Sequence, residues 1–379
     1  MPELVLLDVP AGDAYVVAIK SVLDNGDAFA PIDPRLPPAE RRRVIEALRP
    51  TAVIASDGTR SPLSGGRPVE PGDAMVMTTS GTTGLPKPVV HTVSSIAASA
   101  VSTSRALDID PASDRWLACL PLAHIGGMSV VLRSLLTGTP VTVLPGFDAE
   151  TVTELALSGG VTRVSLVTKA LRAIDPSLFR TVLLGGAAPP ADRPPNCIAT
   201  YGMTETGSGV VYEKRALDSV ELRIDETGGI WVRGPMLLRA YRMYADDIDP
   251  KTVEGWFSTG DAGGFNADGS LFVSGRVGDV IVSGGEKIWP ELVEPLLGRH
   301  PLVAEAAISG QPDADWGSVV VAHVIPADPA NPPNLDDLRA FVKESLPAWY
   351  APKRLRLHVS LPRTGSGKVR RSELGEWET

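Results

Sequence analysis

The sequence of 379 residues contains only two cysteines, Cys119 and Cys197, and both stand in apolar surroundings. Two such cysteines make a disulfide framework or a thiolate metal site unexpected. No run of about eighteen apolar residues occurs, so the sequence predicts no transmembrane helix. The N-terminus, MPELVLLDVP, has no basic region before its short apolar stretch and is not typical of a secretory signal peptide.

Basic charge is also scarce. Lysine and arginine number 36 against 45 aspartates and glutamates, for a net charge of −9, which argues against a nucleic-acid-binding surface. The composition, 43% hydrophobic and 21% charged, is ordinary for a globular protein. We therefore expect a cytoplasmic enzyme of two or three domains, without membrane insertion. Whether it forms a homodimer is left open.

Short apolar runs alternate with helix-like segments before about residue 220, which predicts mainly parallel sheets flanked by helices. The predicted strands are 51–56, 74–79, 115–122, 139–145, 163–167 and 180–186, and helices are predicted at 93–107 and 130–138.

After about residue 220 the residues alternate around Gly-Gly and Asp-Gly turns, which indicates antiparallel strands. Strands at 303–309 and 319–326 and a helix at 334–347, with Asn334 as its N-cap, then predict a small α+β unit. The expected fold class is α/β, with a large N-terminal domain, a small antiparallel barrel-like part, and a small C-terminal α+β domain. The expected domains are 1–275 and 276–379.

The segment TTSGTTGLPKPVVHT, residues 78–92, is rich in small and hydroxyl residues and contains one lysine. It fails the P-loop pattern, because Pro86 stands where the second glycine should be and Pro88 follows Lys87. Proline disfavours α geometry in the preceding residue, so we expect no helix directly after Lys87. Glycine N–H groups, hydroxyls and a lysine still suit a phosphate. The alternative is a flexible surface turn.

Further motifs follow in a fixed order. They are LLGGAAPP (183–190), TYGMTETGSG (200–209), STGDAG (258–263), GRVGDVIVSGGEKIWPELVE (275–294) and PRTGSGKVRR (362–371). With the loop, they resemble the adenylate-forming superfamily of acyl- and aryl-CoA synthetases, peptide-synthetase adenylation domains and luciferases, from about residue 74 to the C-terminus. The resemblance implies ATP, Mg²⁺ and CoA, an acyl-adenylate intermediate, and a C-terminal lid domain that rotates about a hinge.

The same resemblance implies residue roles. The phosphate-binding residues would be Thr79, Ser80, Gly81, Thr82, Thr83, Gly84 and Lys87. The adenine site would comprise Gly185, Gly186, Ala187 and Tyr201, with Gly202 and Met203 in the same motif, and the ribose would meet Asp261 and Arg276. Thr204 would lie near the phosphates, Glu205 would bind Mg²⁺ as a hard oxygen ligand, and Lys368 would reach the reacting atoms from the lid. Taken alone, Glu205 would be a surface acid and Lys368 a solvated lysine.

The hinge position, two residues after Arg276, is Gly278, where relatives often carry Asp or Lys. Glycine absorbs a large φ/ψ change at little steric cost. After rotation Gly284, Gly285 and Lys287 would face the channel of the incoming CoA thiol. Pro88 departs from the family, which usually has glycine there, and this proline could stiffen the exit of the loop.

The acid-binding segment is expected within residues 117–138. His124 would act as a gate beside the substrate carboxylate, and Gly126 and Gly127 would leave room for a flat ring. Arg133 lies in a mostly apolar helix, where it either extends to solvent or meets a second substrate carboxylate. The pattern LPLAHIGG-(x)₅-R and the short N-terminal region resemble the o-succinylbenzoate:CoA ligases of menaquinone biosynthesis.

Three alternatives remain for a protein whose partners are ATP, CoA and a small carboxylic acid. It could be another aryl- or acyl-CoA ligase of specialised metabolism, or an adenylating enzyme whose acceptor is an amine or a carrier protein. It could also bind ATP without turnover. The presence of Lys368, Glu205, Asp261 and Arg276 argues against that last alternative.

Overall fold

The computed structural model describes residues 1–80, 86–186, 189–190, 192–363 and 369–374. The chain divides into two compact units. Unit 1 comprises Met1–Leu222 with Val232–Phe257, and unit 2 comprises Arg223–Trp231 with Ser258–Thr379.

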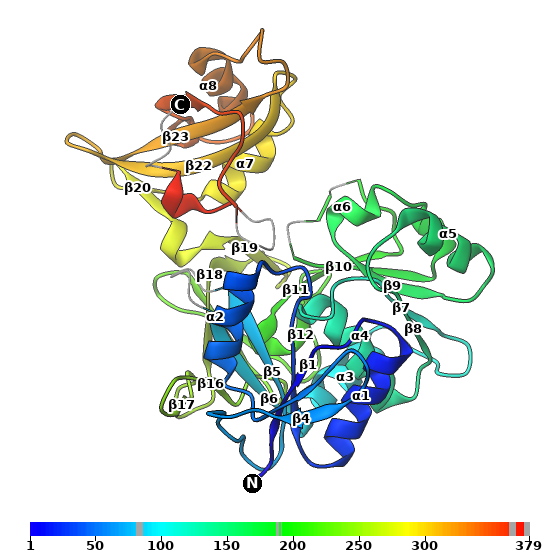
Figure 1. Ribbon diagram of the computed structural model, residues 1–379. Helices are drawn as coiled ribbons and strands as arrows, with labels where there is room; N and C mark the ends of the chain where they lie inside the picture. The colour runs from blue at the N-terminus through cyan, green and yellow to red at the C-terminus, as the bar shows by residue number, and fades with distance from the viewer. Residues whose placement is uncertain (81–85, 187–188, 191, 364–368, 375–379) are drawn as a thin grey trace. The chain divides into compact units, whose positions relative to one another are not determined.

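The first sheet of unit 1 has eight strands in the order β17-β16-β6-β5-β2-β1-β3-β4 (Figure 1). Its strands are β1 (Leu4–Leu7), β2 (Ala28–Pro31), β3 (Ala52–Ile54), β4 (Arg60–Pro62), β5 (Asp73–Ser80), β6 (Pro86–Thr92), β16 (Ala240–Arg242) and β17 (Asp247–Ile248). Helices α1 (Asp13–Asp24) and α2 (Pro38–Leu48) connect the parallel strands β1, β2 and β3. Strand β6 pairs antiparallel with both β5 and β16, so late-chain β16 lies beside the early motif.

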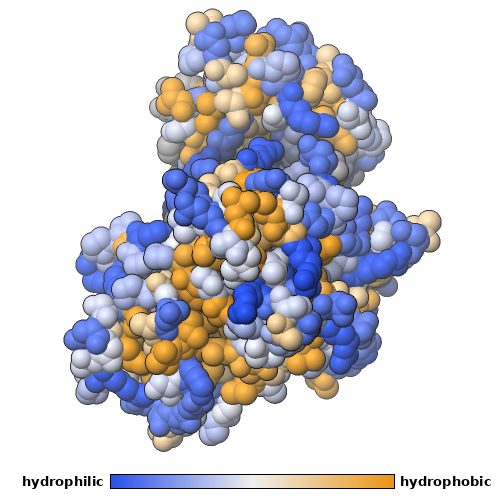
Figure 2. Space-filling model, turned by 90° about the vertical axis from the view of Figure 1, so that its right-hand side faces the viewer, coloured by the Kyte–Doolittle hydropathy of each residue, from blue (hydrophilic) through white to orange (hydrophobic). Residues whose placement is uncertain are grey.

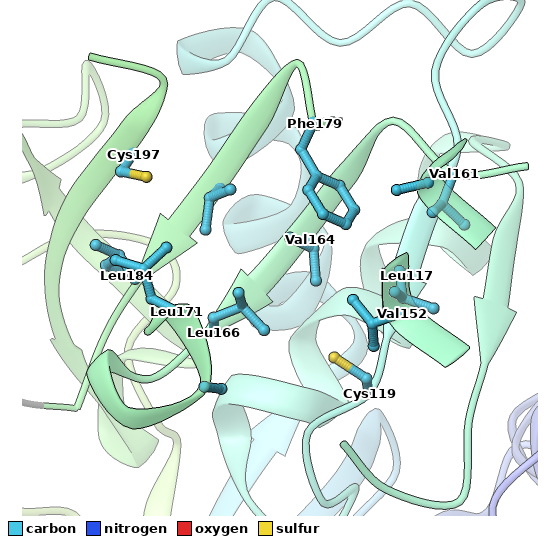
Figure 3. Close-up of a cluster of buried hydrophobic side chains, with 13 residues drawn as sticks. Leu117, Cys119, Val152, Val161, Val164, Leu166, Leu171, Phe179, Leu184 and Cys197 are labelled. Atoms are coloured by element: carbon cyan, nitrogen blue, oxygen red, sulfur yellow. The ribbon is translucent and has the colours of Figure 1, made fainter. Parts of the chain in front are cut away.

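The second sheet of unit 1 has seven strands in the order β13-β12-β11-β10-β9-β7-β8. They are β7 (Trp116–Ala118), β8 (Val141–Val143), β9 (Arg163–Leu166), β10 (Thr181–Leu184), β11 (Cys197–Met203), β12 (Ser208–Tyr212) and β13 (Arg215–Ala216). Its helices are α3 (Val93–Ala106), α4 (Ile125–Thr137), α5 (Ala149–Leu157) and α6 (Thr168–Leu171). Strands β8, β7, β9, β10 and β11 are parallel. A buried apolar cluster joins strand residues, such as Val164, to residues of the helices α5 and α6, such as Val152 and Leu171 (Figure 3).

Unit 2 contains most of an antiparallel sheet and a separate α+β part. The sheet has the order β14-β15-β18-β19, with β14 (Glu221–Ile224), β15 (Gly229–Arg233), β18 (Phe257–Phe265) and β19 (Leu271–Arg276). The α+β part consists of hairpin β20 (Ile281–Ser283) and β21 (Glu286–Ile288), strands β22 (Val303–Asp313), β23 (Gly317–Pro326) and β24 (Arg354–Leu357), and helices α7 (Pro290–Leu297) and α8 (Leu335–Lys343). Short 3₁₀ turns occur at Pro176–Leu178, Thr204–Thr206, Val277–Asp279, Ala348–Tyr350 and Arg371–Glu373.

The predicted strands between residues 51 and 186 are all confirmed, as are the antiparallel strands after residue 220. Asn334 is confirmed as the N-cap of α8, because its side chain accepts the Asp337 N–H at 2.9 Å. The prediction for α4 was wrong at its start: the helix begins at Ile125 rather than at residue 130. Its first turn therefore contains both glycines of the acid-binding segment.

Both cysteines are buried as free thiols in the cluster of Figure 3. Burial raises the pKa of the Cys119 thiol to about 12. None of the helices in the described part of the chain is long and apolar enough to cross a membrane. Figure 2 shows one face of the molecule, on which hydrophobic and hydrophilic residues gather in separate patches, as is common on folded proteins.

Candidate active site

The phosphate-binding motif lies on a β-hairpin. Strands β5 and β6 place Thr79 opposite Lys87, and the Thr79 hydroxyl donates to the Lys87 carbonyl oxygen at 3.4 Å. The prediction that no helix follows Lys87 directly is confirmed, since β6 continues to Thr92 and α3 begins at the next residue. Several motif residues lie outside the described part of the chain: Gly81, Thr82, Thr83 and Gly84, and the side chain of Ser80.

Lys87 and Glu205 both contact the side chain of Tyr241. The Lys87 ammonium nitrogen lies 3.4 Å from the centroid of the Tyr241 ring. The Tyr241 hydroxyl donates a hydrogen bond to Glu205 Oε1 at 3.0 Å. The predicted phosphate-binding lysine and the predicted metal ligand therefore contact the same tyrosine. The sequence analysis did not identify Tyr241 as a residue of the site.

His91 links the hairpin to the TYGMTE motif on its other side. The ring is fully buried, and Nε2 lies 2.7 Å from the carbonyl oxygen of Thr204. Burial lowers the pKa of His91 to about 4, against the raising effect of the Thr204 hydrogen bond. The imidazole is therefore neutral near pH 7, and Nε2 carries the proton because a carbonyl oxygen can only accept. His91 stands inside the quoted motif, yet sequence reasoning assigned it no role.

The predicted adenine-binding residues lie where β10 and β11 run parallel. The Thr200 hydroxyl donates to the Leu184 carbonyl oxygen at 3.0 Å, and a Cβ on Gly185 would come within 3.2 Å of that hydroxyl. Gly186 has a φ of 84°, which favours glycine. Tyr201 follows Thr200 on β11, so the carboxyl end of β10 and the TYGMTE motif are adjacent.

The remaining residues of these two motifs have distinct places. A side chain on Gly202 would clash with the carbonyl oxygen of Ser208, at a bulge where the β11–β12 register shifts. Met203 ends β11, and Thr204 opens the 3₁₀ turn that carries Glu205. Ala187 lies outside the described residues. Ligands commonly bind at this carboxyl edge of an α/β sheet.

His124 is the N-cap residue of α4, and its side chain is 47% exposed. Its Nε2 lies 3.9 Å from an oxygen of Asp33, which also binds the Arg35 guanidinium at 2.6 and 2.9 Å. The hydrogen bonds from Arg35 hold the pKa of Asp33 below its usual range. An exposed imidazole beside a fixed carboxylate is compatible with a gate.

The two glycines of α4 differ in their surroundings. A Cβ on Gly127 would lie 2.5 Å from the Leu120 carbonyl oxygen, so this glycine lets α4 approach the preceding main chain. The space at Gly127 is therefore filled by the protein itself and not left for a ring. A Cβ on Gly126 would meet only the Leu120 side chain, at 3.6 Å.

Arg133 is 1% exposed, which excludes the interpretation that it extends to solvent. Its guanidinium carbon lies 4.6 Å from the centroid of the Trp116 ring. Nε and Nη1 have no hydrogen-bond partner among the residues described. Burial lowers the pKa of Arg133. A buried cation with unmet donors is energetically costly, so a ligand that supplies an anion would be favoured here.

In unit 2, the predicted ribose residues are cross-strand partners. Asp261 on β18 pairs with Arg276 on β19, and Arg276 Nε lies 2.8 Å from Asp261 Oδ1. Asp261 is buried, while Arg276 is about half exposed and also donates to the Thr259 carbonyl oxygen at 3.1 Å.

The predicted hinge and CoA-side residues follow in unit 2. Gly278 lies in a 3₁₀ turn, and a Cβ there would meet nothing within 4 Å. Gly284 and Gly285 form the turn of the β20–β21 hairpin with φ values of 59° and 87°, a geometry that strongly favours glycine at both positions. Lys287 is exposed on β21. Lys368 lies outside the described residues.

The described residues contain no group of three or more His, Cys, Asp or Glu side chains that could hold a metal ion. A single carboxylate nevertheless suits Mg²⁺ when it is bound with ATP, because this ion takes most of its ligands from phosphates and water. Glu205, oriented by Tyr241 through Oε1, fits that donor set.

Family comparisons agree with this arrangement. Residues 65–242 match the AMP-binding enzyme family, and residues 292–368 match the AMP-binding enzyme C-terminal domain. The chain belongs to the AMP-binding enzyme family, which confirms the resemblance seen in the motifs.

Among its relatives, the 2-succinylbenzoate–CoA ligase of Listeria monocytogenes is 35% identical over 80% of this chain and 70% of the relative. The ligase of the same name from Bacillus licheniformis is 35% identical over 79% and 69%. The o-succinylbenzoate CoA synthetase (MenE) of Bacillus subtilis, solved with the acyl-adenylate OSB-AMP, matches with a TM-score of 0.87 at 28% identity, over 99% of this chain and 88% of that one. The likeness confirms the expected fold class.

Proposed function

We propose that this chain is an ATP-dependent acid–CoA ligase of menaquinone biosynthesis. It would convert o-succinylbenzoate, ATP and CoA to o-succinylbenzoyl-CoA, AMP and pyrophosphate through an acyl-adenylate. The observation that carries the proposal is the 35% identity to 2-succinylbenzoate–CoA ligases over 70% of their length. The array of Lys87, Tyr241 and Glu205 supports it, because it offers a phosphate ligand and a metal ligand side by side.

In the first half-reaction, a carboxylate oxygen of the acid attacks the α-phosphorus of ATP. The bond from that phosphorus to the bridging oxygen breaks, and pyrophosphate leaves. Lys87 would bind the phosphates with the backbone of the hairpin loop, and Glu205 would hold Mg²⁺, which offsets phosphate charge. Gly185, Gly186 and Tyr201 would hold adenine, and Asp261 with Arg276 would hold the ribose. Lys368 would stabilise the charge that develops between the carboxylate and the α-phosphate.

In the second half-reaction, the CoA thiol loses its proton and the sulfur attacks the acyl carbonyl carbon. The bond from that carbon to the adenylate oxygen breaks, and AMP leaves. We propose that rotation at Gly278 precedes this step. The observed conformation gives no reason for glycine there, since a Cβ would meet open space and the φ lies outside the left-handed region. A second conformation would explain the residue. Gly284, Gly285 and Lys287 would then face the thiol.

Arg133 is the proposed determinant of a diacid substrate. Its unmet donors and its burial favour an anionic partner, and o-succinylbenzoate retains one carboxylate after the other has been activated. His124 would then act as the gate near the reacting carboxylate, beside the space at Gly126.

A product assay tests the proposal. The purified protein receives ATP, Mg²⁺, CoA and o-succinylbenzoate, with benzoate, medium-chain fatty acids and amino acids in parallel reactions. Mass spectrometry of the thioester and AMP should show o-succinylbenzoyl-CoA and no comparable thioester from the other acids. If another acid gives the thioester instead, the adenylating mechanism stands and that acid is the substrate. An adenylate that never reacts with CoA would indicate an amine or carrier-protein acceptor.

Two further predictions from the sequence stay predictions. Subcellular fractionation would check the cytoplasmic location, and light scattering of the purified protein would check for a homodimer.

A further inference from the structure

Tyr241 connects the two oppositely charged residues of the site. Its ring lies under the Lys87 ammonium at 3.4 Å, and its hydroxyl donates to Glu205 Oε1 at 3.0 Å. Tyr241 is only 8% exposed, so its surroundings restrict its movement. Among the described contacts, no ion pair joins Lys87 directly to Glu205.

The main chain fixes Tyr241 in this place. On the β16 strand Tyr241 is opposite Val89 of β6, and Lys87 lies two residues before Val89, on the same face of the strand. Leu238, three residues before Tyr241, donates its N–H to the Glu205 carbonyl oxygen at 2.8 Å. The segment that carries Tyr241 is thus hydrogen-bonded to the strand of Lys87 and to the turn of Glu205.

An ammonium and a carboxylate that contact the same side chain attract one another and would ordinarily tend toward a direct ion pair. Such a pair would satisfy both charges internally, and ATP and Mg²⁺ would have to break it before binding. Tyr241 offers each charge a neutral partner instead: the π face holds the cation, and the hydroxyl holds the anion. Both contacts are weaker than those that a charged ligand would make, so neither prevents Lys87 from binding phosphate or Glu205 from binding Mg²⁺.

We propose that Tyr241 is a positioning residue that keeps Lys87 and Glu205 apart and available, so that the lysine is ready for phosphate and the carboxylate for Mg²⁺. This inference rests on the proposed ATP and metal roles of Lys87 and Glu205. The two parts of the side chain have separate roles: the hydroxyl positions Glu205 through a hydrogen bond, and the ring positions Lys87 through a cation–π contact.

Two variants separate these tasks. Tyr241→Phe keeps the ring and removes the hydroxyl, so the Mg²⁺ concentration needed for half-maximal ATP binding should rise about tenfold, the loss expected for one hydrogen bond to a charged group. Its affinity for ATP at saturating Mg²⁺ should stay within about twofold of wild type. Tyr241→Leu also removes the ring and allows Lys87 to reach Glu205, so both quantities should worsen by about tenfold.

Isothermal titration calorimetry of the full chain with ATP, over a series of Mg²⁺ concentrations, gives both quantities without any acid substrate. Tyr244→Phe and Tyr244→Leu are the matched controls, because Tyr244 lies just after β16, is 80% exposed and, among the described residues, its ring contact is with the Arg49 guanidinium. They should match wild type. Thermal unfolding of each variant verifies that it is folded, and Tyr241→Phe alone decides the hydroxyl role if the leucine variant is unfolded.

The inference is overturned if Tyr241→Phe leaves the Mg²⁺ dependence of ATP binding unchanged, or weakens ATP binding at saturating Mg²⁺ as much as Tyr241→Leu does. Failure of the proposed function would give a different experimental result. Wild-type protein that binds ATP with Mg²⁺ but activates no acid would remove the ligase proposal and leave the Tyr241 comparison valid. Wild-type protein without Mg²⁺-dependent ATP binding would overturn both.

Discussion

The free energy of unfolding should change little or rise when Arg133 is replaced by methionine. Arg133 is 1% exposed, and its Nε and Nη1 have no hydrogen-bond partner among the described residues. Replacing buried charge by an apolar side chain of similar volume is neutral or stabilising by about 1–4 kcal/mol in known cases. The lost contact with the Trp116 ring offsets about 0.5–2 kcal/mol of this gain. The net change should therefore lie between about 1 kcal/mol of lost and about 3.5 kcal/mol of added stability.

Arg163 provides the matched control. It is also buried, but Nη2 lies 2.8 Å from Asp114, and Nη1 donates to the Thr181 hydroxyl at 2.8 Å and to the Leu107 carbonyl oxygen at 3.0 Å. Burial would raise the pKa of Asp114, yet the hydrogen bond from Arg163 helps to hold it low. Arg163→Met leaves that buried carboxylate with a weaker set of partners and should destabilise the protein by about 3–5 kcal/mol.

The assays are urea unfolding of both variants and steady-state kinetics of Arg133→Met. Loss of a charge-assisted contact of about 1.5–3 kcal/mol should raise the KM for o-succinylbenzoate about 10- to 150-fold. The KM for benzoate-like monoacids should change by less than about threefold. The reasoning is refuted if Arg133→Met is as destabilising as Arg163→Met, since Arg133 would then be a structural residue. An unchanged preference between diacid and monoacid would remove it from the pocket.

Three further predictions concern the lid, the hinge and the buried histidine. Lys368→Ala should nearly abolish ATP–pyrophosphate exchange yet let a supplied acyl-adenylate react with CoA; equal loss of both half-reactions would count against this split. Gly278→Pro should slow thioester formation more than adenylation in single-turnover assays, with Gly278→Ala as the folding control, because its Cβ meets nothing within 4 Å; parallel slowing would argue against a hinge. The pKa of His91 falls from 6.5 to about 4 on folding, so the neutral ring contributes to the free energy of unfolding above pH 6.5. That contribution is lost as the pH falls from 6.5 to 4. In urea unfolding, His91→Gln should reduce the change of the unfolding free energy between pH 6.5 and 4 by up to about 3 kcal/mol. The part of this change that comes from His323, whose pKa is also about 4, should remain. Identical pH profiles of the variant and the wild type would contradict the prediction.

The buried parallel strands were predictable because burial on both faces of a sheet requires mostly apolar residues. RVSLV and RTVLLGG are short segments rich in valine and leucine, as expected for strands covered on both faces, and β9 and β10 fall within them. The start of α4 was not predictable in this way. By propensity, Gly126 and Gly127 weaken a helix, yet the close approach of Gly127 to the Leu120 carbonyl oxygen makes glycine the residue that fits.

The motif residues of the site could be found because each motif is short and local. Tyr241 could not, since its contacts depend on the pairing of β16 with β6, which brings together residues that are distant in the sequence. His91 of β6 likewise acquires its role from Thr204, which lies in the 3₁₀ turn directly after β11 of the other sheet. A three-residue strand such as Ala240–Arg242 has no pattern from which this register could be read.

The charged pair expected to meet the ribose, in unit 2, and the one expected to meet phosphate and Mg²⁺, in unit 1, are built differently, and their expected ligands explain the difference. Asp261 and Arg276 form a direct ion pair, 2.8 Å apart, and the ribose hydroxyls expected there are neutral. A neutral hydroxyl can join that pair, because a carboxylate has further lone pairs to accept its hydrogen bond. Lys87 and Glu205 are expected to bind a phosphate and a metal ion, so a direct ion pair between them would compete with both ligands. A neutral tyrosine between the two charges removes that competition, which is why the Mg²⁺ dependence of Tyr241→Phe is the measurement that bears most directly on how this site works.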